Sequence, residues 1–440
     1  MLVGYSGGAD STCLLHLLHR LGHDVTAAYL HHGQRVEADA EVKQCAKFCD
    51  EIGVPFLSGK ADVPLMAREL KIGLEEAGRN ARYEFFRRAA VAAEAPLIAT
   101  AHTRTDLIET VLLNIARGCG LAGLTGIPAR RDNIVRPLLP FEREETKAYC
   151  AENGFWTHDD PANSDLSFAR ARVRHRIVGD FQSINPRFVD AVARLAKTAD
   201  EEDRFLNGVA AAALENAEIP LNGDLAFLTH DIEVAFRRTA MTALPAVVFK
   251  RGLRLAVGAV GGALEFEHCE RLMWDVPARD KGALTCEGGQ VVVEWDANEV
   301  HIRQVQPSLP YRFNLTLPGE TASDEFHWQF TAYMTVPGPQ ERASLDAYLE
   351  PSAIKGTLYF RSFQEGDTVQ PLGFHGRRKM SDVLGERHLT HAARARLPIL
   401  CDLSGPLWAP GVCLSERMRL QPETQEAIFV RFGEIRRDNG

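Results

Sequence analysis

Short apolar runs alternate with amphipathic stretches over residues 1–155 of the chain. The apolar runs have the length and composition of strands, and they lie at 2–5, 25–32, 55–58, 96–102 and 134–139. The stretches between them repeat apolar residues at helical spacing and predict helices at 11–21, 37–52, 73–94, 105–117 and 142–153. Strands that alternate with helices predict an α/β fold with a doubly wound parallel sheet. Ligands of such sheets bind beyond the carboxyl ends of the strands.

The pattern changes after residue 188. It is helical at first, and a β-hairpin is then expected over 288–303, with its turn at 296–298. Residues 308–344 alternate like strands but are broken by prolines, which suggests a connection. From residue 354 the chain mixes short strands with a basic segment. These changes predict a mainly helical second domain, a connecting region and a small mixed α/β C-terminal domain, with region boundaries at 1–185, 186–305, 306–353 and 354–440.

Composition narrows the class of protein. A chain of 440 residues, 45% hydrophobic and 25% charged, is typical of a soluble protein of two or three domains. It contains no apolar run of the roughly 20 residues that a membrane helix needs, and no signal-peptide pattern. We therefore expect a cytoplasmic protein without a membrane partner. The nine cysteines contain no C-x-x-C pair and are expected to be reduced thiols.

The net charge of -9 argues against non-specific binding of nucleic acid over the whole surface. It leaves room for a local basic surface that binds a structured RNA.

The segment SGGADS, Ser6 to Ser11, follows the first strand and leads into the first helix. Gly7 and Gly8 allow the backbone to approach an anion, and the helix N-terminus supplies positive potential. Ser6 and Ser11 add hydroxyl donors, and Ala9 lies between the glycines and Asp10. Asp10 can hold the magnesium ion that accompanies a phosphate. The stretch therefore predicts a phosphate-binding loop, although it lacks the G-K-[ST] of the Walker pattern.

This strand–SGGADS–helix segment resembles the PP-loop of the ATP pyrophosphatases, which cleave ATP to AMP and pyrophosphate. Other stretches are similar to the tRNA(Ile)-lysidine synthetase family and cover most of the chain. They are LHHGQR (30–35), EEAGRNARYEFF (75–86), ATAHTRTDLIETVLLNIARGCGLAGLTGI (99–127), VRPLL (135–139), DDPANSDLSFARARVRHRIV (159–178) and FRSFQEGDTVQPLGFHGRRKMSDVLGE (360–386).

The resemblance implies a specific reaction. ATP adenylates the C2 oxygen of the wobble cytidine in an isoleucine tRNA with a CAU anticodon, with Mg²⁺ as cofactor. Free L-lysine then attacks C2 through its ε-amine, and AMP leaves. The resemblance also implies that the first domain is the PP-loop catalytic domain and that the second and the last domains bind the tRNA.

Three residues are expected to carry the chemistry. Asp10 and Asp106 can share magnesium near the triphosphate, and His102 lies just beyond a strand end on the same side. Asp106 could instead orient the incoming amine or accept its proton. The sequence leaves these roles open.

Further side chains are expected to bind substrates. For ATP these are the loop residues together with His32 and Arg35. For lysine and tRNA, the candidates are Glu76, Arg79, Arg82, Glu109, Arg117, Arg170, Arg172, Arg174, Arg377, Arg378 and Lys379. The alternative for Glu76, Arg79 and Arg82 is an ordinary charged helix surface. His31 and His32 point to opposite faces of a strand end, so one is expected to be packed.

The sequence departs from the family pattern at four positions within these stretches. Gly78 stands where alanine is usual, and Thr105 replaces the first of two aspartates. Leu107 replaces a glutamine and Ala171 an asparagine. The family also commonly has a basic segment before the first strand, whereas this sequence begins almost on that strand.

Two other functions remain open. A PP-loop enzyme that thiolates tRNA is one alternative, with Cys119 as the one cysteine on an expected functional loop. A non-catalytic RNA-binding protein that keeps the loop as a relic is the other. A homodimer is a further open alternative for the assembly.

Overall fold

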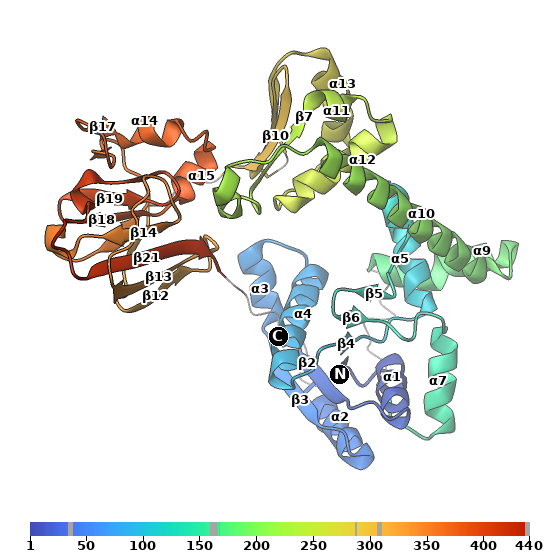
Figure 1. The fold of residues 1–440 in the computed structure, drawn as a ribbon. Coiled ribbons are helices and arrows are strands. Elements are labelled where there is room, and N and C mark those ends of the chain that lie inside the picture. Colours follow the sequence, from blue (N-terminus) through green and yellow to red (C-terminus); the bar gives the residue numbers. More distant parts are fainter. Residues whose placement is uncertain (34–37, 159–165, 167, 287, 306–309, 436–440) are drawn as a thin grey trace. The chain divides into compact units, whose positions relative to one another are not determined.

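The computed structural model describes residues 1–33, 38–158, 166, 168–286, 288–305 and 310–435 (Figure 1). The chain forms two compact units, Met1–Phe205 and Leu206–Gly440. Each unit has its own sheets and its own hydrophobic core.

The first unit is built on a six-stranded sheet in the order β3-β2-β1-β4-β6-β5. Its parallel strands are β1 (Leu2–Gly4), β2 (Thr26–His31), β3 (Phe56–Lys60), β4 (Ile98–Ala99) and β6 (Ile134–Val135). The edge strand β5 (Arg130–Arg131) is antiparallel to β6. The strand order turns back between β1 and β4. Their carboxyl ends therefore form the switch point at which such sheets bind ligands.

Helices follow the strands as the sequence predicts. They are α1 (Ala9–Arg20), α2 (Ala38–Ile52), α4 (Leu74–Ala92), α5 (Arg104–Ala116) and α7 (Arg143–Glu152). The expectations for these five helices are confirmed within a few residues at each end. The short helices α3 (Val63–Leu70) and α6 (Leu121–Leu124) were not predicted, because one or two turns give too little hydrophobic periodicity.

Residues of β1 pack on both faces of the sheet. Val3 packs with Leu14 and Leu15 of α1 in one cluster, whereas Leu2 packs with Phe86 of α4 in another. Gly4 is needed for the second contact, because a Cβ there would lie 2.7 Å from the ring of Phe86. Both faces are therefore covered, as an apolar parallel strand requires.

A second helical segment completes the first unit. It runs through α8 (Ala169–Arg172), the π-helical turn η2 (Val173–Ile177) and α9 (Val178–Ile184). The 30-residue helix α10 (Phe188–Ala217) follows and continues into the second unit.

The second unit begins with a helical region that contains a four-stranded sheet. The helices are η3 (Gly223–Leu228), α11 (Arg238–Thr242), α12 (Ala246–Ala259) and α13 (Phe266–Ala278). The predicted hairpin is confirmed as β9 (Val291–Trp295) and β10 (Glu299–Gln304). Strands β7 (Glu233–Arg237) and β8 (Gly282–Thr285) pair with its two sides.

The C-terminal part is a mixed, strand-rich structure with two short helices, α14 (Met380–Gly385) and α15 (His391–Arg396), and a 3-10 turn at each of η4 (Pro351–Ala353) and η5 (Glu416–Met418). One sheet contains β11 (Arg312–Asn314), β15 (Tyr359–Arg361), β18 (Ile399–Asp402), β19 (Gly405–Ala409) and β20 (Cys413–Leu414). A second contains β12 (Gly319–Ser323), β13 (Trp328–Thr335), β21 (Ala427–Glu434) and β14 (Asp346–Leu349). A third pairs β16 (Thr368–Val369) with β17 (Arg378–Lys379).

The described part of the expected connection at 306–353 belongs to these sheets rather than linking separate domains. Its strand β13 pairs with β21 over eight residues, from Trp328↔Glu434 to Thr335↔Ala427. Trp328 is fully buried in the C-terminal core. The strand-like pattern expected over part of this stretch is confirmed, but the sequence did not show that these strands join a sheet, because their partner β21 lies far along the chain. The other expected boundaries, including that at residue 185, stay predictions.

Candidate functional site

The glycine loop has the geometry of a phosphate-binding turn at the end of β1. Gly7 has a φ of +76°, which favours glycine, and a Cβ there would lie 2.9 Å from Cys45 Sγ. Gly8 is the N-cap of α1. The Ser6 and Ser11 hydroxyls lie 3.1 Å apart, and Ser11 donates to Gly8 O at 3.0 Å. Glycine backbone, two hydroxyls and a helix N-terminus thus meet at the switch point, as an anion site needs.

A segment after α7 lies against this loop. The His158 amide donates to Gly7 O at 2.8 Å, and a Cβ on Gly7 would lie 3.2 Å from the Trp156 ring. The His158 ring is paired with the buried carboxylate of Glu41 at 3.0 Å and stacks on Trp156. Trp156 is 39% exposed, so it can form a wall of the loop. The sequence analysis did not identify Trp156 or His158.

Asp10, in the first turn of α1, faces helix α7. Arg143 donates from Nε to Asp10 Oδ2 at 3.1 Å, and the Thr146 hydroxyl donates to Oδ1. Burial raises the pKa of the Asp10 carboxyl above its ordinary value, although Arg143 and Thr146 act in the opposite direction. Asp10 is held in place by both partners.

Asp106 is in the first turn of α5, beyond the end of β4. Its Oδ2 accepts from Thr103 N at 2.9 Å and from Thr103 Oγ1 at 3.0 Å. Its Oδ1 faces guanidinium groups of Arg143 (3.4 Å), Arg170 (3.7 Å) and Arg174 (3.9 Å). Burial alone raises the pKa of this carboxyl, but the arginines and the Thr103 amide outweigh it and hold the pKa below its ordinary value. Asp106 is therefore a carboxylate at neutral pH.

Arg143 joins the two aspartates that the sequence analysis assigned to magnesium. Its Nε contacts Asp10 and its Nη2 contacts Asp106. It is the first residue of α7, where the helix dipole disfavours a cation. That placement was a signal that the arginine serves partners outside its helix, and the sequence analysis missed it.

Glu109 lies one turn after Asp106 and is fully buried. Arg170 Nε donates to it at 2.8 Å, and Arg174 donates from Nε at 2.5 Å and from Nη2 at 3.0 Å. A buried carboxylate with charge-assisted partners of this kind fixes the positions of both arginines. The structure thus brings together Asp106, Glu109, Arg170 and Arg174 from distant segments. Arg172 points elsewhere and donates to Leu166 O at 3.1 Å.

His102 lies between the end of β4 and Asp106. Its Nδ1 is 3.0 Å from the Thr100 hydroxyl. Burial lowers the pKa of His102 to about 4, and Asp106 only partly opposes this effect. The imidazole is therefore neutral at physiological pH and can exchange hydrogen bonds but carries no charge.

The two histidines at the end of β2 separate as expected. His31 is buried, and its Nδ1 accepts from Gly33 N at 2.9 Å. His32 is partly exposed, and its Nε2 lies 3.4 Å from Arg82 Nη2. Arg79 is exposed and stacks over the Tyr83 ring at 4.9 Å.

Three other candidates lie outside this group of contacts. Glu76 is an exposed residue of the first turn of α4, and Arg117 is exposed at the C-cap of α5. Arg35 lies outside the described residues. The roles proposed for these side chains stay predictions.

The residues that depart from the family pattern make ordinary packing and hydrogen-bond contacts in the fold. Thr105 Oγ1 accepts from the Arg143 amide at 3.3 Å, which links α5 to the start of α7. Leu107 packs in the cluster between α5 and α10, and Ala171 is buried. A Cβ on Gly78 would lie 3.5 Å from His32 Nδ1, an ordinary contact. These positions therefore leave the contacts of Asp106 and Glu109 intact.

In the basic segment of the C-terminal part, Arg377 and Lys379 are exposed, whereas Arg378 is half-buried. Arg377 donates to Thr368 Oγ1 at 2.7 Å. Arg378 is held by Glu386, with Nη1–Oε2 and Nη2–Oε1 distances of 3.1 and 2.5 Å. Lys379 is exposed on the same strand. Arg342, which the sequence analysis did not identify, stacks over the Phe374 ring at 4.1 Å.

A magnesium ion fits this site with Asp10 as a protein ligand, since Mg²⁺ commonly takes one or two carboxylates together with phosphate oxygens and water. The described residues contain no cluster of three or more acidic, histidine or cysteine side chains placed to hold a metal by themselves. A shared ion would compete with Arg143 for both carboxylates. The sharing of magnesium by Asp10 and Asp106 stays a prediction.

The cysteines and one pocket of the second unit include none of the predicted site residues. All nine cysteines are free and eight are buried, and burial raises the pKa of Cys13, Cys45 and Cys49 to about 12. Such thiols are poor nucleophiles.

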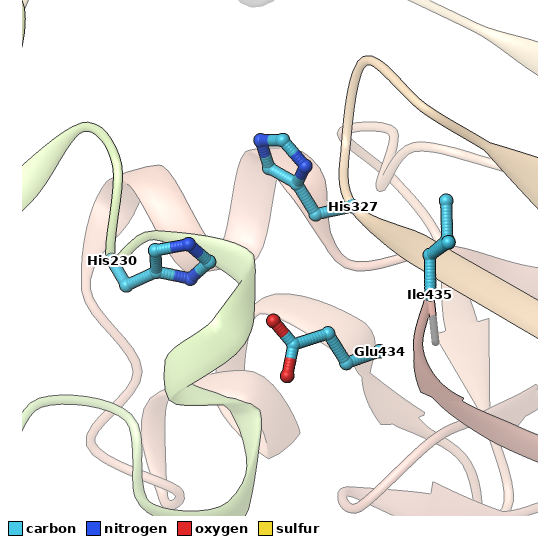
Figure 2. A pocket seen from close by; sticks show the side chains of 4 residues that line it. All are labelled: His230, His327, Glu434 and Ile435. Atoms are coloured by element: carbon cyan, nitrogen blue, oxygen red, sulfur yellow. The ribbon is translucent and has the colours of Figure 1, made fainter. Parts of the chain in front are cut away.

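In the second unit, a pocket of about 260 Å³ is lined by His230, His327, Glu434 and Ile435 (Figure 2). Its His327 ring faces Asp231 at 3.4 Å, and no predicted site residue lines it.

Comparison with known proteins gives two family matches. The PP-loop domain matches residues 1–180, and the TilS substrate C-terminal domain matches residues 357–430. The tRNA(Ile)-lysidine synthase of Symbiobacterium thermophilum is 30% identical over 465 residues, covering 98% of this chain and 93% of that protein. The same enzyme of Dehalococcoides mccartyi is 28% identical over 462 residues, covering 98% and 95%. A crystal structure of the TILS C-terminal domain is 21% identical, with a TM-score of 0.27, and covers 29% of this chain and 100% of its own.

The switch-point loop and the first match together define a PP-loop ATP-binding protein. The similarity over nearly the full length narrows that class. This chain belongs to the tRNA(Ile)-lysidine synthase family. Among the described residues, every helix is too short or too polar to cross a lipid bilayer.

Proposed function

We infer that this protein forms lysidine on tRNA(Ile) in an ATP-dependent reaction. The observation that carries this conclusion is the convergence at one switch point. The phosphate loop joins the end of β1 to the helix that carries Asp10. The helix that begins just after β4 carries Asp106 and the buried Glu109. The relatives that share the whole length of the chain are named for lysidine synthesis. Apart from Cys119, the other eight thiols are buried, so the thiolation alternative would depend on Cys119 alone, without a second accessible thiol to relay sulfur.

We propose that ATP binds with its phosphates on the loop from Ser6 to Ser11. The backbone at Gly7 and Gly8, the two hydroxyls and the N-terminus of α1 supply the donors. Asp10 would hold magnesium, which when bound would supply positive charge to neutralise the leaving pyrophosphate. His32 and Arg35 are proposed to contact the nucleotide from the end of β2, and Trp156 borders the loop.

Asp106 is proposed to receive the amine of free lysine beside the loop, and the buried Glu109 is proposed to shape this substrate site through the arginines that it holds. Asp106 has a depressed pKa and is a weak base, so attraction and orientation of the lysine amine suit it better than proton abstraction. Arg170 and Arg174 are fixed by Glu109 and can bind the phosphate of the adenylate or of the RNA. The neutral imidazole of His102 can form a hydrogen bond with the reacting cytidine or amine.

The tRNA partner is proposed to be an isoleucine tRNA with a CAU anticodon. Arg377, Arg378 and Lys379 are proposed to contact its phosphates, and cations at the surface position a nucleic acid without reading its bases.

The test is ATP-dependent incorporation of labelled lysine into that isoleucine tRNA. A methionine tRNA with the same anticodon is the control substrate. We expect label in the isoleucine tRNA alone. Asp10→Ala and Asp106→Ala should abolish transfer while the affinity for tRNA persists. Release of pyrophosphate without incorporation of lysine would contradict the proposed nucleophile.

A further inference from the structure

The helical run of α8, η2 and α9, residues 169–184, presents an unusual surface of the first unit. Ile177, Phe181 and Ile184 are 40, 41 and 80% exposed. Their spacing of four and three residues places them on one face. Phe168, at the start of the run, is 43% exposed. Clustered apolar side chains in water indicate a binding surface rather than a core.

The same segment is strongly basic. Residues 168–187 contain five arginines and one acidic residue, Asp180, although the whole chain has a net charge of -9. Arg170 and Arg174 turn toward Glu109. Arg172, Arg176 and Arg187 are exposed residues. A chain that is acidic overall thus concentrates positive charge beside its exposed aromatic side chains, which is the pattern of a single-stranded nucleic-acid site.

The same helical run reaches the candidate active site, because its Arg170 and Arg174 contact Glu109 and face Asp106. Arg174 lies within the five-residue π-helical turn η2, and Ile177 ends it. Such turns inside helices are frequent at functional sites. The start of the run therefore contacts Glu109 and Asp106 through its arginines. Near its end, Phe181 stacks on Phe188, with the ring centroids 4.7 Å apart and the ring planes at 11°.

We propose that this face, defined by Ile177, Phe181, Ile184, Arg172, Arg176 and Arg187, binds the single-stranded anticodon loop next to the cytidine being modified. The inference rests on the proposed function for the identity of the RNA. Exposed rings offer stacking surfaces to unpaired bases, and the arginines meet their phosphates. A second copy of this chain would also cover apolar side chains, but the concentration of exposed arginines favours a polyanion.

The experiment measures binding of a fluorescent hairpin that comprises only the anticodon stem and loop of the isoleucine tRNA. It uses the full chain without ATP or lysine, so it does not depend on catalysis. The variants are Phe181→Ala and the double charge reversal Arg176→Glu with Arg187→Glu. The matched control reverses Arg87 and Arg88, two arginines of α4 that are 65 and 74% exposed in their side chains.

We expect the Arg176/Arg187 reversal to weaken hairpin binding at least tenfold more than the control. It should also lower the slope of log affinity against log salt by roughly 0.7 for each phosphate that no longer has an arginine partner. Phe181→Ala should weaken binding roughly tenfold. Alanine replacement of Arg377, Arg378 and Lys379 should weaken the binding of full-length tRNA but leave that of the hairpin unaffected.

Three results would overturn the proposal. In the first, the reversal and the control have equal effects. In the second, the wild-type protein modifies full tRNA but does not bind the hairpin at low salt. In the third, the wild type sediments as a dimer that Ile184→Ser converts to monomers with unchanged RNA affinity, so a second copy covers the face. Hairpin binding with the expected variant pattern but no lysine transfer would support this surface and contradict the proposed function instead.

Discussion

Arg143 donates from Nε to Oδ2 of Asp10 at 3.1 Å, and the contact joins the start of α7 to the first turn of α1. The other end of the same guanidinium reaches Asp106 at 3.4 Å. Two carboxylates on separate helices are therefore held by one planar cation, whose fork geometry suits a bridge of this kind.

Arg143→Met should damage both stability and catalysis. The substitution leaves two largely buried carboxylates without their shared cation, and we expect the free energy of unfolding at pH 7 to fall by about 3 kcal/mol. Arg143→Lys should recover little, because a single ammonium cannot span both carboxylates. Urea unfolding together with kcat and KM for ATP and lysine checks this.

Lys147→Met is the matched control for that variant, since Lys147 is an exposed residue of the same helix. It should change the unfolding free energy by less than about 0.5 kcal/mol. Equal effects of the two variants would show that Arg143 does not organise the site.

Glu109→Gln should release the two arginines from their anchor. The amide keeps the volume but loses the charge that holds Arg170 and Arg174, so we expect a loss of roughly 2 to 3 kcal/mol in stability. Displacement of both guanidinium groups should lower kcat/KM for lysine transfer roughly a hundredfold. Thermal unfolding and single-turnover lysine transfer measure the two effects.

Glu84→Gln provides the comparison. Glu84 also faces two arginines, Arg87 at 2.5 Å and Arg88 at 3.8 Å, but its side chain is 52% exposed. The surface pairs should contribute less than about 1 kcal/mol. If Glu84→Gln proved as destabilising as Glu109→Gln, burial would not be the cause of the effect.

His102 should make stability depend on pH in a defined window. Its pKa is lowered from 6.5 to about 4 by burial, so the unfolded chain binds the proton more readily than the folded one. The stabilisation that comes from this shift is complete above pH 6.5. As the pH falls toward 4, the free energy of unfolding decreases by up to about 1.4 kcal/mol per pH unit. Unfolding curves of the wild type and His102→Gln between about pH 4 and 8 test this. Parallel pH dependences would contradict the shift.

Gly78→Ala should stabilise the protein. Gly78 lies inside α4, where alanine is favoured over glycine by about 1 kcal/mol, and the added Cβ meets the His32 ring at 3.5 Å. Gly4→Ala is the opposite case, because its Cβ would lie 2.7 Å from the buried Phe86 ring. We expect the melting temperature to rise in the first variant and fall in the second. A rise in both would show that the packing against Phe86 yields easily.

The local pattern of the sequence predicted most of the catalytic fold. Apolar runs followed by helical periodicity located β1, β2, α1, α2, α4, α5 and α7, because each is long or apolar enough to be recognised alone. The SGGADS loop could be recognised from the sequence for a related reason. Its glycines, hydroxyls and aspartate are consecutive, so their chemistry depends on one turn of backbone rather than on distant partners.

Only the tertiary structure decided which charges meet. Arg143 is 133 residues from Asp10, and Arg174 is 65 residues from Glu109, so no local pattern pairs them. Strands β12 and β13 looked like a connection until β21, about a hundred residues later, supplied the backbone partners of β13. Residue types and spacing determined the phosphate loop and the class of chemistry. Burial and long-range contact determined which carboxylates are paired, and with what, because desolvation and charge neutralisation exist only once distant segments have packed together.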